Sequence, residues 1–218
     1  MLGNPLIVHR ELICAASPFF KAAFEGDQNN QDGIVTLHQD QYDRDAVETY
    51  LKWLYTNQIL SPSGDDEFRY LIDAYLTGDK FGDTAFKNAV LDEIIERCSQ
   101  QNEYPTDIAE YIWSNTAEGS PLRRLYIDFY AWVSDSDFYA MDDGGSDVLV
   151  APREFLRDVL CRMSEVRNRC RFPGAYIYPW VMNRCQYHEH GGGDCCRSSD
   201  WGSPSTLTNL YWTLNDEK

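Results

Sequence analysis

The sequence has no excess of basic side chains. Its 19 lysines and arginines stand against 35 aspartates and glutamates, which gives a formal net charge of −16 at pH 7. A chain with this balance is repelled by a phosphate backbone, so we expect no direct binding to nucleic acid. The acidity by itself is typical of a solvated surface and identifies no partner.

Long apolar runs are missing as well. No stretch approaches the roughly 20 apolar residues of a membrane-spanning helix, and the start, Met1–Pro5, has no basic segment followed by an apolar one. Seven cysteines form an odd set, and five of them lie in the last third of the chain, which does not suit an even disulfide framework. We therefore expect an intracellular protein, cytoplasmic or nuclear, that does not bind membranes.

Recognisable catalytic motifs are also absent. His9 has no activated serine or cysteine near it, and it is better interpreted as a residue at the start of a helix. The glycine runs at 144–145 and 191–193 are not followed by the Lys-Ser/Thr pair of a phosphate-binding loop. Adjacent acids such as Asp65 and Asp66 are expected to be solvated charge. The sequence therefore predicts a protein that is not an enzyme.

What the sequence does contain is a series of amphipathic helices. Pro18 opens one of them, in which Phe19, Phe20 and Phe24 are expected to pack in the core rather than to form a partner-binding face. Further helices are predicted where apolar residues recur at helical spacing, at Ala46–Leu54, Phe68–Leu76, Phe86–Cys98, Leu122–Val133 and Phe155–Val166. Two runs rich in β-branched residues, Leu6–Val8 and Ile34–Leu37, are predicted to be strands.

The N-terminal blocks resemble a known family. The segment from Val8 to Phe24, VHRELICAASPFFKAAF, is similar to the first helical hairpin of BTB/POZ domains. Three later segments resemble the later helices of that fold, in the same order: Tyr50–Thr56, Ala74–Gly82 and Asn88–Val90. The resemblance covers about residues 6 to 100. It implies a module that presents helical and edge-strand surface to other proteins and needs no cofactor.

Within the family, the chain is similar to the short BTB proteins of filamentous fungi, whose helical C-terminal region often has a segment like Leu122–Trp132. The chain begins after the position of the family's first strand, so a strand-exchanged dimer is not expected, and any self-association would use helical surface. Members that recruit a cullin scaffold carry a hydrophobic residue, any residue and an acid. Here Asp73 follows Tyr70-Leu71-Ile72 one position late, so we expect no tight scaffold binding.

The predicted fold is α+β and mainly helical. Residues 1–101 form a BTB/POZ-like interaction domain whose small sheet lacks its first strand, residues 102–171 form an all-α C-terminal region, and residues 172–218 form an irregular tail rich in Cys, His and Gly. The predicted function is a non-catalytic protein–protein interaction module that assembles or scaffolds a complex. The alternatives are a substrate adaptor of a cullin-type ubiquitin ligase and a metal-dependent hydrolase that uses the tail.

One cluster in the tail has a spacing suited to a metal ion. Cys185, His188, His190 and Cys195 supply the thiolate and imidazole ligands that zinc prefers. The glycines that precede Cys195 would let the chain fold back between the two halves of the cluster. The alternative is a set of exposed histidines and unligated thiols, and Cys196 leaves the fourth ligand open. The cluster predicts a structural zinc ion, and no other cofactor is expected.

Overall fold

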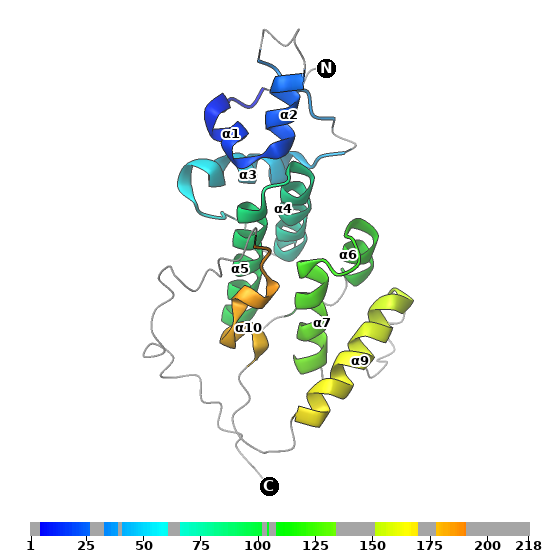
Figure 1. Cartoon of the computed structure of the whole chain (residues 1–218). Coiled ribbons are helices and arrows are strands. Elements are labelled where there is room, and N and C mark those ends of the chain that lie inside the picture. Colours follow the sequence, from blue (N-terminus) through cyan, green and yellow to red (C-terminus); the bar gives the residue numbers. More distant parts are fainter. Residues whose placement is uncertain are drawn as a thin grey trace, which may run out of the picture.

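The part of the chain that the structure describes is mainly helical (Figure 1). The computed structural model describes residues 5–26, 33–38, 41–60, 66–101, 104, 108–133, 151–169 and 178–190. Within these residues the elements are α1 (Arg10–Ala16), α2 (Pro18–Gly26), α3 (Arg44–Thr56), α4 (Glu67–Phe81), α5 (Thr84–Gln101), α6 (Ala109–Asn115), α7 (Pro121–Val133), α9 (Arg153–Arg169), α10 (Pro179–Met182) and the 3-10 helix η2 (Arg184–Tyr187). The mainly helical fold predicted from the apolar spacing is confirmed.

The small sheet is not confirmed. Leu6–Val8 and Ile34–Leu37 have no assigned secondary structure, and no strand occurs elsewhere in the described ranges. Val35 and Leu37 are half-buried against the core while the residues before each of them are exposed, an alternation typical of a strand. A β-branched run favours a strand locally, but the strand also needs a ladder of backbone hydrogen bonds to a neighbour.

An aromatic cluster holds α2 and α3 on the end of α4. The ring of Phe81 lies at its centre, with its centroid 4.7 Å from that of Phe20 and 5.0 Å from that of Tyr50. Phe19 stacks on the same ring at 5.5 Å. Phe20 is buried, whereas Phe19 and Phe24 are half-buried and pack against the core. The prediction that this phenylalanine stripe belongs to the core is therefore confirmed.

Two buried polar side chains fix the starts of α2 and α5. The Ser17 hydroxyl donates to the carbonyl of Phe81 at 2.6 Å and accepts a hydrogen bond from the Phe20 amide at 3.3 Å, so it caps α2 and ties it to α4. Asp83 caps α5 by accepting from the amide of that helix's third residue at 3.0 Å, and its second oxygen accepts from the Tyr50 hydroxyl at 3.1 Å. Both buried groups thus have the partners that burial requires.

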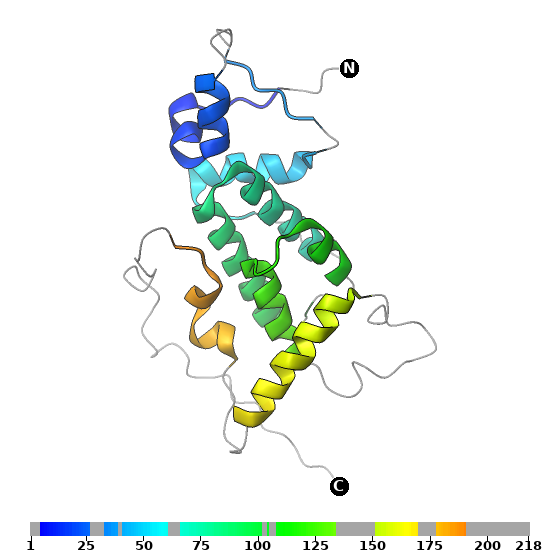
Figure 2. The same cartoon turned by 45° about the vertical axis from the view of Figure 1, so that its right-hand side comes forward.

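The described residues of the C-terminal region form helices and no strand, as predicted. Phe155 of α9 lies between Trp113 of α6 and Tyr130 of α7, at 4.8 Å from each ring. Helices α7 and α9 pack side by side along much of their length (Figure 2). No helix in the described residues is long and apolar enough to cross a membrane. The domain division at 101/102 stays a prediction.

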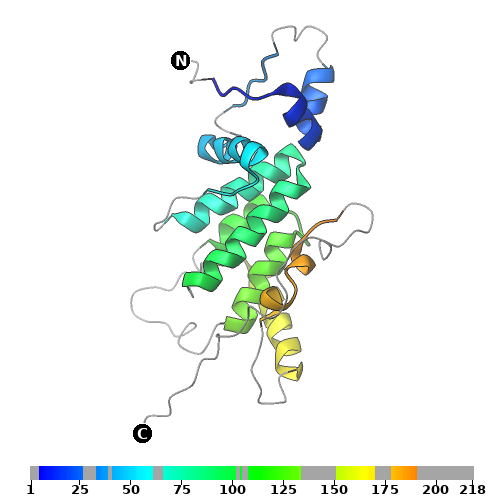
Figure 3. The same ribbon diagram turned by 90° about the vertical axis from the view of Figure 1, so that its left-hand side faces the viewer.

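Part of the predicted irregular tail is folded. Residues 178–190, which we call the docked segment, contain α10 and η2 and lie beside α5 and α7 (Figures 2 and 3). Trp180 and Tyr187 anchor the segment, with 0% and 1% of their surface exposed. Two short turns that bury two large aromatic side chains create no apolar periodicity, which is why the sequence pattern did not predict them.

Candidate protein-interaction surface

Exposed apolar side chains occur beside the first two helices. Leu6, Ile7 and Ile34 have 40%, 91% and 67% of their surface exposed, and we call these three residues the N-terminal surface. Leu6 and Ile7 lie just before α1, and Ile34 follows α2 in the sequence. Figures 1 and 3 place both segments next to α1 and α2, at the end of the molecule away from α9. Exposed apolar groups on neighbouring segments are typical of protein-binding surfaces.

One contact fixes the segment that carries Ile7. The backbone N–H of His9 donates to the Tyr55 hydroxyl at 2.9 Å, and the ring Nδ1 of His9 lies 2.7 Å from the same oxygen. His9 is the residue that immediately precedes α1, as predicted. Because Tyr55 belongs to α3, this pair holds the segment against a rigid helix while the Ile7 side chain remains exposed.

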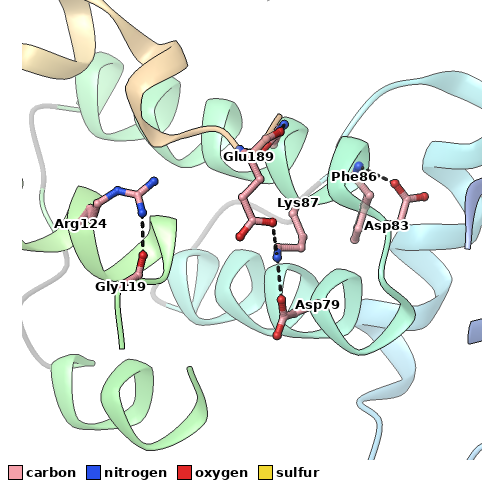
Figure 4. Close-up of polar contacts among 8 residues, drawn as sticks. Asp79, Asp83, Phe86, Lys87, Gly119, Arg124 and Glu189 are labelled. Carbon is pink, nitrogen blue, oxygen red and sulfur yellow. Dashed lines mark hydrogen bonds and ion pairs between the residues drawn. The ribbon is translucent and has the colours of Figure 1, made fainter. Parts of the chain in front are cut away.

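The docked segment contacts one face of α5. Lys87 of α5 is almost fully buried, and its ammonium group lies 2.6 Å from an Asp79 carboxylate oxygen and 2.7 Å from one of Glu189 (Figure 4). Burial by itself would lower the pKa of Lys87, but the hydrogen bonds to Asp79 and Glu189 outweigh it, so the pKa is raised. The cation therefore stays charged where it joins the two parts of the chain.

Backbone and amide bonds strengthen this junction. The Asn88 side-chain amide donates to the carbonyl of Glu189 at 2.9 Å, and its oxygen accepts from the Glu189 N–H at 3.0 Å. One helical turn further along α5, Asp92 lies 3.2 Å from His188 Nε2. One more turn on, Glu96 accepts from Arg184 at 2.8 Å. One face of α5 thus binds the docked segment at successive turns, since residues four apart share a face.

Asp128 of α7 is the second polar centre beneath the docked segment. One carboxylate oxygen accepts from the Tyr187 hydroxyl at 2.6 Å, and the other pairs with the Arg162 guanidinium of α9 at 2.5 Å. Burial, and then the nearby Asp128 charge, raise the pKa of the Tyr187 hydroxyl, so it remains a hydrogen-bond donor. The hydrogen bond to Asp128, in the same way, raises the pKa of Arg162. A single buried carboxylate therefore joins α7, α9 and the docked segment.

Asp73, the acid that the sequence places one position late for cullin recruitment, is occupied inside the molecule. Its Oδ1 accepts from the Tyr111 hydroxyl of α6 at 2.5 Å, and its Oδ2 lies 3.3 Å from Arg69 Nε. The Arg69 guanidinium also stacks over the Tyr111 ring, 3.4 Å from its centroid. Leu71 and Ile72 are buried in the core. This stretch of α4 therefore contacts Tyr111 of α6 through Asp73 and Arg69.

The described residues that were predicted to bind zinc do not all lie together. Cys185 Sγ and His190 Nε2 lie 3.0 Å apart, whereas His188 is buried and contacts Asp92. Cys195 lies outside the described residues, as does Cys196. No three His, Cys, Asp or Glu side chains converge as a metal-binding group in the ranges that the structure describes. The prediction of a zinc ion is thus not tested by the described geometry.

Sequence reasoning missed the junction at Lys87. In the sequence, Asn88 is an ordinary polar residue on an amphipathic helix and Glu189 is an ordinary charged residue in the tail. No local pattern indicates that they pair over 101 positions. The one indication of a buried ion pair was the position of Lys87. This lysine lies on the apolar side of α5, beside residues of the predicted stripe such as Phe86 and Val90.

The described N-terminal helices, with exposed apolar side chains at their end, are followed along the chain by further helices. Residues 1–95 match the family model of the BTB/POZ domain. The N-terminal part of this chain is therefore a BTB/POZ domain, a class of generally non-catalytic interaction modules, and the resemblance seen in the sequence is confirmed. Comparisons with curated proteins and with solved structures give no significant match.

Proposed function

We propose that this protein is a non-catalytic scaffold that acts inside the cell and binds another protein through its N-terminal surface. The observation that carries the proposal is the 91% exposure of Ile7 on a BTB/POZ domain whose α5 side is already covered by the docked segment. Burial of an exposed isoleucine contributes about 1.5–3 kcal/mol to an association. Among the exposed large apolar side chains of the described residues, Ile7 has the greatest exposed fraction, so the N-terminal surface offers apolar area to a partner.

Recruitment of a cullin-type scaffold is the alternative that we do not favour. Both oxygens of Asp73 already have partners, one from Tyr111 and one from Arg69. A scaffold that used this carboxylate would first have to break both contacts, which reduces its net gain on binding. Two observations argue against cullin recruitment: Tyr111 of α6 contacts Asp73 of α4, and Asp73 comes one position late in the sequence.

A metal-dependent hydrolase is also not proposed. Such an enzyme needs three protein ligands, an open coordination position and a general base in one cleft. Of the residues that the sequence offered, His188 is directed to Asp92 on α5 rather than toward the Cys185 and His190 pair. A role in binding other proteins requires no such arrangement.

Affinity purification of the tagged full chain tests the proposal. The wild type is compared with Ile7→Asp and with Leu160→Asp, because Leu160 is similarly apolar and 64% exposed but lies on α9. We expect at least one captured protein to be lost from the Ile7→Asp sample and retained by Leu160→Asp. Identical sets of captured proteins at equal intensity from all three chains would contradict a role for the N-terminal surface.

A further inference from the structure

We propose that a pocket between α6, α7 and α9 binds a free basic amino acid, such as lysine or arginine. The pocket has a volume of about 430 Å³ and is lined by Glu110, Trp113, Ser114, Arg123, Pro152 and Glu154. Ligand pockets in proteins have volumes of about 300–1,000 Å³, so this one has the size of a small-molecule site. The inference goes beyond the proposed function and does not depend on it, because the N-terminal surface lies on other parts of the chain.

Trp113 and Arg123 give the pocket a fixed wall. The Trp113 ring packs edge to face against Phe155 of α9, with centroids 4.8 Å apart, and only 8% of this tryptophan is exposed. The Arg123 guanidinium of α7 lies over the Trp113 ring, 5.1 Å from its centroid. Its Nη2 donates to the Trp113 carbonyl at 2.6 Å and also to the Thr116 carbonyl, and its Nε donates to the Thr116 hydroxyl at 2.9 Å. The guanidinium is therefore held in place before a ligand binds, which lowers the cost of binding.

Part of this guanidinium is left for a ligand. Its hydrogen bonds to α6 and to the turn after it use Nε and Nη2, and Nη1 has no partner among the described residues. The indole N–H of Trp113 is buried and has no hydrogen-bond acceptor among those residues either. Both groups are donors on residues that line the pocket. Because arginine nitrogens form strong charge-assisted hydrogen bonds with carboxylates, this wall suits the carboxylate of a ligand.

Two glutamates give the pocket its negative charge. Glu110 of α6 and Glu154 of α9 are exposed, and no basic side chain in the described part of the chain forms an ion pair with either of them. Arg157, on the next turn of α9, forms its ion pair with Asp158 at 2.8 Å and interacts with Glu154 only at longer range. Since the lining has two glutamates and one arginine, its net charge at neutral pH is negative by a single unit.

A basic amino acid matches these groups in number and in sign. Its carboxylate suits Arg123, and its α-ammonium group and side-chain cation suit Glu110 and Glu154. Its single net positive charge balances that of the lining. An anion alone would be repelled by the two glutamates, whereas a diamine would leave the free nitrogen of Arg123 without an acceptor. A ligand bound to all three groups joins α6, α7 and α9 and should therefore raise the Tm.

Calorimetric titration of L-lysine into the full chain tests the proposal. We expect a Kd below about 1 mM at low ionic strength, and weaker binding as salt is added, because charge pairs near solvent are screened. Cadaverine, which lacks the carboxylate, should bind at least about tenfold more weakly. This comparison changes the ligand rather than Arg123, because Arg123 also holds α6 to α7 and its replacement could unfold them.

Two further ligands test the cationic groups. Norleucine lacks the side-chain ammonium of lysine, and Nα-acetyl-lysine lacks the α-ammonium, so each should bind at least about threefold more weakly than lysine. Nα-acetyl-lysine also resembles the C-terminal lysine of a protein, whose α-nitrogen is an uncharged amide. Weaker binding of this compound thus distinguishes a site for the free amino acid from one for a protein C-terminus.

Variants of the two glutamates test the same contacts from the side of the protein. Glu110→Gln and Glu154→Gln change exposed side chains, so both proteins should fold, and we expect each to weaken lysine binding about threefold. The double variant should weaken it roughly tenfold. Glu118→Gln is the matched control, because Glu118 is an exposed acid between α6 and α7 that does not line the pocket, and it should leave the Kd unchanged.

Three results would overturn the proposal. The first is the absence of saturable lysine binding with a Kd below about 10 mM. The second is binding of cadaverine, norleucine or Nα-acetyl-lysine as tight as that of lysine, since each of them lacks one of the groups that the pocket is proposed to bind. The third is an unchanged Kd in the double variant of Glu110 and Glu154, which would place the amino acid elsewhere on the protein.

Discussion

Lys87 and Glu189 are 102 residues apart in the sequence, yet the ammonium nitrogen of one lies 2.7 Å from a carboxylate oxygen of the other. Lys87 belongs to the BTB/POZ domain, and Glu189 belongs to the docked segment. Asp79 completes the group from α4 (Figure 4). Because the cation is nearly buried and the two carboxylates are partly exposed, the contact stabilises the folded state more than a fully exposed pair would.

Lys87→Met should destabilise the protein, because it leaves two carboxylates facing each other without a cation. We expect a loss of about 1–2 kcal/mol in the free energy of unfolding, less than for a fully buried pair because both acids reach solvent. Urea denaturation measures it. Lys52→Met is the control, since Lys52 is 57% exposed and 4.0 Å from its acid, and it should change the free energy by less than about 0.5 kcal/mol. Equal effects of the two variants would contradict this view of the junction.

The same contact predicts a loss of stability in alkali. The folded-state pKa of Lys87 is raised above the ordinary value of 10.5, so the folded state holds the proton more tightly than the unfolded state does. The resulting stabilisation is fully present below the unfolded-state pKa and is lost as the pH rises through the folded-state pKa. Between about pH 9 and about pH 12 the wild type should lose more stability than Lys87→Met. Parallel pH profiles for the two proteins would show that the pKa of Lys87 is not raised.

Asn88→Ala should loosen the docked segment without unfolding the rest of the chain. The variant removes one donor and one acceptor that the backbone of Glu189 uses, at a cost of about 1–3 kcal/mol. Hydrogen exchange followed by mass spectrometry should show faster exchange in residues 184–190. Asn115→Ala is the control, because its amide donates to the Tyr111 carbonyl within α6 and so makes a bond local to that helix. Unchanged exchange in the docked segment would mean that Asn88 does not hold it.

A purified cullin-type scaffold should bind this protein weakly. Because Asp73 is occupied by Tyr111 and Arg69, we expect titration calorimetry to give no dissociation constant below about 1 μM. Tyr111→Phe, which removes one of the two contacts, tests whether an available Asp73 is sufficient. Sub-micromolar binding by the wild type would show that the register of α4 has been misread.

Self-association through exchanged N-terminal strands is not expected, because no strand is assigned to residues 6–8 or 34–37. Light scattering should give the mass of a monomer at micromolar concentration, or a dimer that persists when residues 1–5 are removed. A dimer abolished by that deletion, with unchanged helical content, would indicate that the N-terminal residues are exchanged after all.

The sequence was sufficient to predict helices, because the spacing of apolar residues that indicates a helix is a local pattern. Apolar spacing predicted Leu122–Val133, and α7 runs from Pro121 to Val133, because a helix buries every third or fourth residue whatever its partner is. The docked segment and the Lys87 junction could not be predicted in this way. They depend on which residues meet across 102 positions, and neither Glu189 nor Asn88 differs locally from a solvated polar residue. The small sheet is not confirmed in the described residues, because strand propensity at Ile34–Leu37 does not supply a pairing partner.

Binding of a partner identified by affinity purification is the most direct test of the central claim, that the N-terminal surface is the interaction site. Calorimetric titration of that partner into the wild type, Ile7→Asp and Leu160→Asp measures the contribution of each exposed apolar side chain. We predict that Ile7→Asp weakens binding at least roughly tenfold and that Leu160→Asp stays within about twofold of the wild type. Equal affinity of Ile7→Asp and the wild type would contradict the account, whereas loss of binding by Leu160→Asp alone would place the interaction on α9.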